Sequence, residues 1–444
     1  MKIGALISGK VLKVTAAMLI MAQLFGGCAN SEKQAEGTRE ENGGNELTIS
    51  VTSENNFLTE AANLYMEEND GVEVTINIID IQNNRDKYTQ TVSTELMGGK
   101  GADIYDAMFL SYFKLADSGM LADLGEYISD ELKNGDYYTT LFDSFKYNGK
   151  QYALPLNYNF TGYKKNKDVA DEYNINIPDG NLKLRDLISL SSQLPDDGSV
   201  MLVGEGGGGM NDLILAGDLV AQSFKQFVDM ESKKSEFDND KFYSIINAVN
   251  SFVERKQLHS HKAAVNGEID YTKQVKSLLT PYFLYTPAMC NDGTMDYSGM
   301  VHLTNDDGFT TFSSSGFIPV VNNNSPNKEL AADFIMFMLS DEMQSSPELL
   351  FCPVNKNAVS HVSKYVYEDS KAGGWLPENF TEETLENNIK IFGELTESLN
   401  IYAYQERFIN SLIYNELDML FSGSETMEQA AQNLQSSINS YLNE

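Results

Sequence analysis

The chain has 444 residues, with 32 Lys and Arg against 64 Asp and Glu, which gives a formal net charge of −32. A phosphate backbone would repel so acidic a protein, which argues against nucleic-acid binding. Three cysteines are too few for a disulfide framework. At about 100–200 residues per domain, the length predicts two or three domains, and a hydrophobic content of 42% is enough for a core.

The N-terminus has the features of an export signal. Three lysines without an acidic residue precede an apolar run over residues 14–25, which is followed by Gly26-Gly27-Cys28. The run is too short to cross about 30 Å of hydrocarbon but fits the apolar core of a signal peptide. Small residues before Cys28 resemble the bacterial lipobox, in which the cysteine is lipidated and becomes the new N-terminus. We therefore expect a lipoprotein signal peptide over residues 1–27; the alternative is an ordinary signal peptide with an incidental cysteine.

The next segment, residues 28–45, contains no large apolar side chain. Such a stretch cannot bury enough apolar surface to fold, so we expect a flexible tether that joins lipidated Cys28 to a globular body. No later segment has 18 continuous apolar residues. The protein is then exported and anchored by lipid to the outer face of the cytoplasmic membrane. Cys290 and Cys352 could pair or stay free.

The first part of the body alternates between strand and helix patterns. Helices of ten or more residues between strands predict a parallel sheet with helices on both faces. The pattern changes near Pro155, and a second α/β region runs to about residue 310. In chain order, the sequence of the first region predicts a strand over 46–51, a helix from Phe57 to Tyr65, a strand over 72–78, a helix over 85–97, a strand over 103–108 and a short helix that ends near Gly119.

The C-terminal third is predicted to be mainly helical. Ser325-Pro326 has the residue types of a helix N-cap and first helical position. Two amphipathic helices fill the last 50 residues, and a break is expected at Gly423. Thr426 and Gln429 have the spacing of a capping box at the start of the final helix.

A glycine-rich segment, Gly204 to Gly209, fits the pattern GxGxxG. A dinucleotide site is not expected, because Glu205 would place a carboxylate where the pyrophosphate must bind and an exported protein has little access to NAD. A flexible loop between a strand and a helix is the simpler interpretation. It could line a cleft, since glycine lets a ligand approach the backbone.

Metal and catalytic motifs are weak. His259 and His261 form an HxH pair without the further ligands that a metal site needs. Asp238-Asn-Asp240 begins like a calcium loop but lacks its glycine and its terminal glutamate. With 64 acidic residues, chance pairs of carboxylates carry no information about glycoside hydrolysis. We expect no metal, no cofactor and no catalytic residue.

Three stretches resemble the extracellular solute-binding proteins of ABC importers, the family that includes maltose-binding protein. Residues 98–128 are similar to the family's strand and helix before L-x-D-L. Residues 148–175 are similar to its dG-x-x-Y-x-x-P strand and YNKD turn, and residues 313–344 to its G-x-x-I…NKE-A-x-F segment. The last helix also resembles the family's. The matching residues are 98–128, 148–175, 313–344 and 421–438.

This resemblance implies an α/β, two-lobed periplasmic-binding-protein-like fold of type II, with the ligand cleft between lobes joined at a hinge. By analogy, lobe one comprises residues 46–156 plus 314–360, and lobe two comprises residues 157–313 plus 361–444. Closure around the hinge would enclose one small molecule between the lobes.

The resemblance also suggests ligand contacts by position in the chain. Polar side chains would read sugar hydroxyls and aromatic rings would pack on a sugar face. Phe283 and its tyrosine neighbours replace the family's G-x-W strand. With 23 Tyr and 23 Phe, however, most aromatic residues will simply pack in the core. The candidates are Glu54, Asn55, Asn56, Phe109, Tyr158, Asn159, Tyr282, Tyr285, Trp375, Tyr402 and Tyr404.

The resulting hypothesis is a monomeric, lipid-anchored and non-enzymatic protein that captures a sugar and delivers it to the permease subunits of an ABC importer. Family analogy alone supports the sugar. A peptide, an amino sugar or another polar solute is the alternative within binding proteins. A surface polysaccharide hydrolase and an adhesion lipoprotein are the alternatives from other classes.

Overall fold

A computed structural model describes residues 44–81, 86–204, 210–270, 275–288, 296–374, 376–377, 379–403 and 406–444. The predicted signal peptide, Cys28, most of the tether and Cys290 lie outside these residues. Cys352 is buried and is not in a disulfide, and burial raises the pKa of its thiol to about 12.

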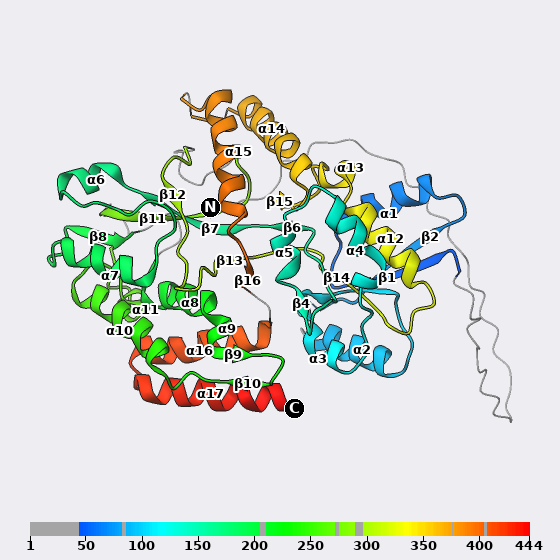
Figure 1. Cartoon of the computed structure of the whole chain (residues 1–444), viewed down its shortest axis with the longest axis horizontal. Helices are drawn as coiled ribbons and strands as arrows, with labels where there is room; N and C mark the ends of the chain where they lie inside the picture. The colour runs from blue at the N-terminus through cyan, green and yellow to red at the C-terminus, as the bar shows by residue number, and fades with distance from the viewer. Residues whose placement is uncertain are drawn as a thin grey trace, which may run out of the picture. The chain divides into compact units, whose positions relative to one another are not determined.

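The first sheet has the strand order β14-β3-β1-β2 (Figure 1). Its three N-terminal strands are parallel, as expected, whereas β14 runs antiparallel to β3. Apolar residues that alternate along β1 are buried, which fixes its register beside β2. The strands are β1 (Glu46–Val51), β2 (Glu73–Ile78), β3 (Ile104–Asp106) and β14 (Pro319–Val321).

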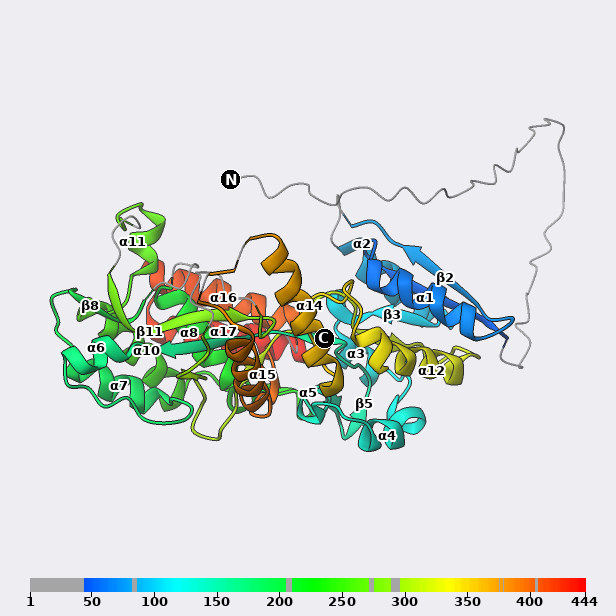
Figure 2. The same cartoon turned by 90° about the horizontal axis from the view of Figure 1, so that it is seen from above.

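Three long helices belong to this sheet. The helix α1 packs on β2 and α12 packs on β14, and Figures 1 and 2 show both helices beside the sheet. The apolar stripe of α2, which includes Tyr88, Val92 and Leu96, is buried in the same core. These helices are α1 (Asn56–Glu68), α2 (Asp86–Met97) and α12 (Lys328–Met338).

Several short elements and two longer helices, α14 and α15, complete this first core. The expected strand over 103–108 is shorter, because a 3-10 turn begins after Asp106. The elements are η1 (Ala107–Phe109), α3 (Tyr112–Asp117), α4 (Gly125–Asn134), α5 (Thr139–Asp143), β4 (Lys146–Tyr147), β5 (Lys150–Gln151), β6 (Asn157–Tyr158), α13 (Asp341–Gln344), β15 (Cys352–Pro353), α14 (Lys356–Ala372) and α15 (Glu382–Thr396).

The second sheet has the order β12-β7-β11-β8 and lies over a separate core. Its strands run in mixed directions: β11 is parallel to β8 but antiparallel to β7, and β12 is also antiparallel to β7. Period-2 patterns identify strands without fixing their direction, which tertiary pairing decides. The strands are β7 (Phe160–Lys165), β8 (Val200–Val203), β11 (Lys276–Leu284) and β12 (Met300–Val301).

Helices surround the second sheet, and the C-terminal pair α16 and α17 pack side by side (Figures 1 and 2). As predicted, Gly423 ends α16 in a left-handed conformation, and Thr426 with Gln429 forms a capping box. The elements are α6 (Lys167–Glu172), α7 (Leu184–Gln193), α8 (Asp212–Gln222), α9 (Phe224–Phe227), β9 (Val228–Asp229), β10 (Lys234–Ser235), α10 (Asp240–Glu254), α11 (His261–Val265), α16 (Arg407–Ser422) and α17 (Met427–Asn443).

The predicted cap at Ser325-Pro326 is wrong. The helix α12 begins at Lys328 with Asn327 at its N-cap position. The Ser325 hydroxyl instead donates to Asp103 at 2.6 Å and accepts from the Asn327 amide at 2.9 Å. A long-range hydrogen bond has therefore displaced the local capping role.

Two short strand pairs lie where the chain passes between the two four-stranded sheets. The antiparallel pair β6–β15 leads into β7, and β13 (Thr311–Phe312) pairs in parallel with β16 (Ile401–Tyr402). Asn159 bridges to Ser313 between these pairs.

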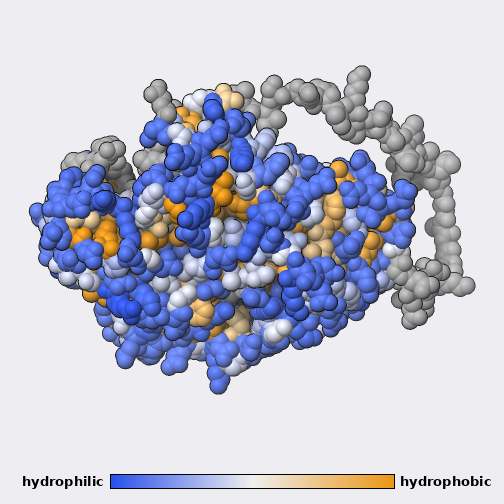
Figure 3. Space-filling view, turned by 45° about the horizontal axis from the view of Figure 1, so that its top comes forward, coloured by the Kyte–Doolittle hydropathy of each residue, from blue (hydrophilic) through white to orange (hydrophobic). Residues whose placement is uncertain are grey.

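Within the described part of the chain, no helix combines the length and apolar character that a membrane span requires. The face drawn in Figure 3 is hydrophilic over most of its area and carries separate apolar patches.

Candidate functional site

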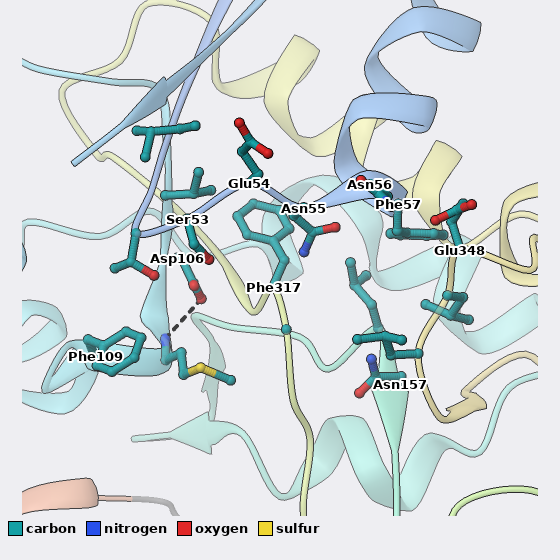
Figure 4. A pocket seen from close by; sticks show the side chains of 18 of the residues that line it. Ser53, Glu54, Asn55, Asn56, Phe57, Asp106, Phe109, Asn157, Phe317 and Glu348 are labelled. Carbon is teal, nitrogen blue, oxygen red and sulfur yellow. Dashed lines mark hydrogen bonds between the residues drawn. The ribbon is translucent and has the colours of Figure 1, made fainter. Parts of the chain in front are cut away.

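A cavity of about 1040 Å³ opens at the carboxyl ends of β1, β2 and β3 (Figure 4). Ligands of open α/β sheets bind at this edge, where loops rather than strands supply the side chains. The walls come from six segments, namely residues 51–57, 78–81, 106–109, 156–157, 316–317 and 348–350.

The loop between β1 and α1 contributes three predicted residues to the wall: Glu54, Asn55 and Asn56. Asn55 is the N-cap of α1, and its Oδ1 accepts from the Leu58 amide at 3.0 Å. This bond fixes the loop, because the capping residue must keep an extended backbone. Glu54 and Asn56 are exposed and can reach a ligand.

Asp106 forms part of the wall at the end of β3, and its side chain is only 4% exposed. Its Oδ1 accepts from the amides of Met108 at 3.0 Å and Ile318 at 3.1 Å. Burial raises the pKa of this carboxyl to about 7, although both N–H groups act to lower it. The group can therefore exchange a proton near neutral pH while its position stays fixed.

Tyr88 holds the ends of β1 and β3 together beneath the cavity. Its buried hydroxyl accepts from the Asp106 amide at 2.8 Å and donates to the Ser50 carbonyl at 2.9 Å. Burial, together with the negative charge of Asp106, raises the pKa of Tyr88 well above its ordinary value. The hydroxyl thus stays protonated and acts as a structural donor.

Asn157 and Gly316 shape another wall. The Asn157 amide donates to the Ser315 carbonyl at 2.8 Å and accepts from the Ser315 N–H at 3.1 Å. Gly316 has a φ of +94°, which favours glycine, and a Cβ there would lie 3.8 Å from the Asn55 amide nitrogen. The loop that presents Phe317 to the cavity is therefore fixed (Figure 4).

Phe109, a predicted contact, is a half-buried part of the wall. The Thr89 hydroxyl donates to its carbonyl at 2.9 Å, and the guanidinium carbon of Arg407 lies 4.5 Å from its ring centroid. Phe109 is thus held through its backbone from α2 and through its ring from α16.

The cavity is acidic. Four acidic side chains line it, of which Asp106 is only partly ionised at neutral pH, and none of the lining residues that the structure describes is Lys, Arg or His. A wall of one sign of charge favours neutral or positively charged ligands over anions. The four residues are Glu54, Asp80, Asp106 and Glu348.

Other candidates lie in the core instead of on the described walls. Tyr158 is fully buried and its hydroxyl is 2.9 Å from the Thr396 hydroxyl. The Tyr402 ring stacks on Phe145 with centroids 4.4 Å apart. Tyr158 lies on β6 and Tyr402 on β16, and both residues belong to the first core, where aromatic rings pack.

The remaining candidates are dispersed. Asn159 and Tyr282 are buried outside the cavity wall. Tyr285 is half-buried in a cluster of rings that adjoins the cavity at Leu350. Trp375 and Tyr404 lie outside the described residues.

Sixteen of the twenty lining residues were not predicted, and five of them show why. Asp80 had a usable signal, since it lies just after the predicted strand over 72–78. Asp106 lies inside the predicted strand over 103–108, and it is the observed β3 that ends there. Phe317, Glu348 and Leu350 had none, because they are brought to the cavity from distant parts of the chain.

The histidine pair has a structural explanation. His261 Nε2 lies 2.5 Å from the Asp418 carboxylate, which joins α11 to α16. Among the described residues, no three His, Cys, Asp or Glu side chains are grouped so that they could hold a metal ion. Residues 205–209 of the glycine-rich segment lie outside the described part.

Residues 50–345 match the family model of the bacterial extracellular solute-binding proteins. No curated protein matches the chain in sequence. Among solved structures, a cyclic α-maltosyl-1,6-maltose binding protein from Arthrobacter globiformis has a TM-score of 0.55 at 16% identity, with 90% of this chain and 99% of that chain covered.

Two further structures each match 90% of this chain and 99% of their own. They are an ABC substrate-binding protein from Listeria monocytogenes in complex with cycloalternan, with a TM-score of 0.51 at 18% identity, and a periplasmic oligogalacturonide binding protein from Yersinia enterocolitica, with a TM-score of 0.57 at 14% identity. At these identities the likeness concerns the fold, which is the expected two-lobed α/β one. From the match over residues 50–345, the chain belongs to the bacterial extracellular solute-binding protein family.

Proposed function

We propose that this protein is the lipid-anchored binding subunit of an ABC importer and that it captures a neutral carbohydrate. The observation that carries the proposal is the cavity of about 1040 Å³ at the carboxyl ends of three parallel strands. Its volume is at the upper end of ordinary ligand pockets, which suits a ligand of more than one sugar ring.

The lining side chains have the chemistry for sugar recognition. Carboxylates and amides can accept from and donate to hydroxyl groups, and Glu54, Asn56 and Asn157 supply both kinds of group. Phe109 and Phe317 offer apolar surface for the C–H face of a ring.

Delivery requires that binding be coupled to closure. In our proposal, lobe one is residues 46–156 plus 314–360, and lobe two is residues 157–313 plus 361–444. The described cavity residues belong almost entirely to lobe one. Lobe two would add contacts on closure, with Tyr404 and Trp375 as candidates, and the permease would recognise the closed form.

The membrane attachment rests on the sequence. We propose that residues 1–27 are removed as a signal peptide, that Cys28 carries the lipid, and that residues 28–45 tether the body. Mass spectrometry of the N-terminal peptide from membranes of a bacterial expression host would detect diacylated Cys28. An unmodified Cys28 would contradict the anchor while leaving the binding function open.

Calorimetric titration of the full chain in detergent tests the binding function. We expect saturable binding of a neutral mono- or oligosaccharide, with an affinity near micromolar, or about −8 kcal/mol, and without any cleaved product. Glu54→Ala should weaken binding about tenfold or more, because it removes a charged hydrogen-bond acceptor. Glu67→Ala, at the far end of α1, is the matched control and should leave the affinity unchanged.

Other outcomes would redirect the proposal. Binding of a peptide or polyamine with no response to any sugar would overturn the carbohydrate assignment. Release of shortened sugars would indicate a hydrolase. No small-molecule binding at all would favour an adhesion protein.

A further inference from the structure

The hairpin of β9 and β10 extends from α17 in the second core to α3 in the first core (Figure 1). Two bonds fix it on α17. Asn439 Oδ1 accepts from the Ser235 amide at 2.7 Å, and the Asn443 side chain donates to the Lys233 carbonyl at 3.1 Å. The Asp229 carboxylate fixes the loop between the strands by accepting from two loop amides, both at 3.0 Å. The hairpin is therefore a rigid arm of the second core.

Two side chains in the loop of this hairpin contact the first core. Met230 is half-buried and packs against both hydrophobic cores. Lys233 Nζ lies 2.8 Å from Asp117 Oδ2, at the end of α3. The Tyr147 hydroxyl donates to the other oxygen of Asp117 at 2.7 Å. Burial acts to raise the pKa of Asp117, but the hydrogen bonds from Lys233 and Tyr147 lower it below its ordinary value. A charged pair and an apolar contact thus join the two cores at one place.

The backbone at Lys233 adds an independent observation. Its φ is +55°, in the left-handed region that glycine adopts at lower cost than other residues. Backbone strain of this kind is concentrated at functional positions, where the surrounding structure maintains it. Lysine occupies this position, and its ammonium group is the part of the hairpin that reaches Asp117.

Packing does not seal this contact. The side chains of Lys233 and Asp117 are 45% and 25% exposed, and Lys114 Nζ lies 3.7 Å from the centroid of the Tyr441 ring. A cavity of about 110 Å³ lies among these groups and Met230. Polar contacts at the surface separate at little cost, because water replaces the partners that they lose. The contact between the hairpin and α3 can therefore open and close.

The helix that the hairpin contacts is continuous with the ligand cavity. Met108 and Phe109 line that cavity, and α3 begins at Tyr112. Arg407 of α16 lies against the Phe109 ring, so a second element of the second core also contacts this segment. A separation of the hairpin from α3 would thus act directly on residues 107–117, which form part of the cavity wall.

We propose that the β9–β10 hairpin is an electrostatic clasp, in which Met230 and the ion pair between Lys233 and Asp117 hold the second core against α3 in the ligand-free protein. When the pair breaks, residues 107–117 and the second core can move apart. Salt weakens a partly exposed ion pair, so the clasp should open more often as salt rises. This inference goes beyond the proposed function, because it concerns the protein without ligand.

Hydrogen exchange of the full chain in detergent, measured without ligand, tests the clasp. Lys233→Met keeps a long side chain but removes its charge. We expect the amides of residues 107–117 and 406–411, which meet where α16 contacts Phe109, to exchange about 1.4- to 5-fold faster, as for loss of an exposed ion pair. About 1 M salt should accelerate the wild type by a similar factor and have little effect on the variant.

Two further variants isolate the ion pair. Lys234→Met is the matched control, because Lys234 is the next residue, is exposed, and pairs along the hairpin with Asp229 instead of reaching α3. It should leave exchange unchanged. Asp117→Asn removes the other charge and keeps an acceptor for Tyr147. Combined with Lys233→Met, it should accelerate exchange no more than either single substitution, since all three proteins lack the same pair.

The results separate a clasp from a local contact. If Lys233→Met accelerates exchange only within residues 228–235, the ion pair fixes the hairpin alone and the clasp is wrong. If the two substitutions have additive effects, or if salt accelerates the wild type and the variant alike, the pair does not hold the cores together. No sugar enters the experiment, so a failure of the carbohydrate proposal in the calorimetric titration would leave this inference standing, and the reverse also holds.

Discussion

At the scale of single residues, Asp106 is deeply buried and also forms part of the cavity wall. Burial raises the pKa of its carboxyl from 3.8 to about 7. A carboxyl with a raised folded-state pKa binds more protons when folded than when unfolded, so stability falls as pH rises between these two values. Asp106→Asn keeps an oxygen that can accept the same two hydrogen bonds but removes the titrating group. We therefore expect this substitution to abolish the fall in unfolding free energy with pH, which is at most about 1.4 kcal/mol per pH unit.

Urea unfolding across that pH range measures the effect. Asp130→Asn, at an exposed position of α4, should keep the wild-type dependence on pH. If the Asp106→Asn profile is parallel to that of the wild type, the carboxyl is ionised throughout in the folded protein and the burial argument is wrong.

At the scale of elements, one carboxylate joins three helices. Glu406 is 3% exposed and caps α16 by accepting from the Phe408 amide at 3.2 Å. It also accepts from the Ser111 hydroxyl before α3 at 2.7 Å and from the Tyr441 hydroxyl of α17 at 2.9 Å. Glu406→Ala removes a cap and leaves two donors without their acceptor, so we expect unfolding free energy to fall by about 2–4 kcal/mol.

Chemical denaturation followed by circular dichroism checks this loss. Glu368→Ala, at an exposed position within α14, should stay within about 0.5 kcal/mol of the wild type. Ser111→Ala removes one of the three bonds and should have an intermediate effect. A loss as small as that of Glu368→Ala would show that Glu406 does not hold these helices together.

At the scale of the whole molecule, the excess of acidic over basic residues extends into the cavity. The chain has 64 acidic residues against 32 Lys and Arg, and four carboxylates line the cavity. We therefore expect a uronic-acid oligosaccharide to bind at least about tenfold more weakly than the neutral sugar of the same length at low salt. The difference should shrink in about 1 M salt, where the Debye length is about 3 Å.

Competition titrations at two salt concentrations measure this preference. Glu54→Gln combined with Glu348→Gln should narrow the difference at low salt, since both residues line the cavity. Equal affinity for the two sugars in the wild type, or a preference for the uronate, would refute the electrostatic argument.

Much of the secondary structure could be predicted because its signals are local. The alternation over 46–51 identified β1, and the spacing of Thr426 and Gln429 identified the start of α17. Ser325 had an equally good local signal, yet its hydroxyl bonds to Asp103 in another part of the chain. Local propensity fails where a distant partner competes for the same group.

The candidate site was predictable in part for a similar reason. Glu54, Asn55, Asn56 and Phe109 follow strands whose carboxyl ends share one edge, so their positions along the chain were enough. Tyr158 and Tyr402 occupied equally suggestive positions but are buried. Residue type does not separate an aromatic ring that packs in the core from one that meets a ligand.

Residues close together in the chain were enough to predict most strands and helices around the first sheet, the capping box of α17 and the segments by which the family is recognised. Three other features follow from tertiary contacts alone: which strands pair antiparallel, the raised pKa of the buried Asp106 carboxyl, and the hydrogen bond from Ser325 to Asp103. Those features depend on contacts between residues far apart in sequence and on the water that packing excludes, and neither is encoded in any single segment.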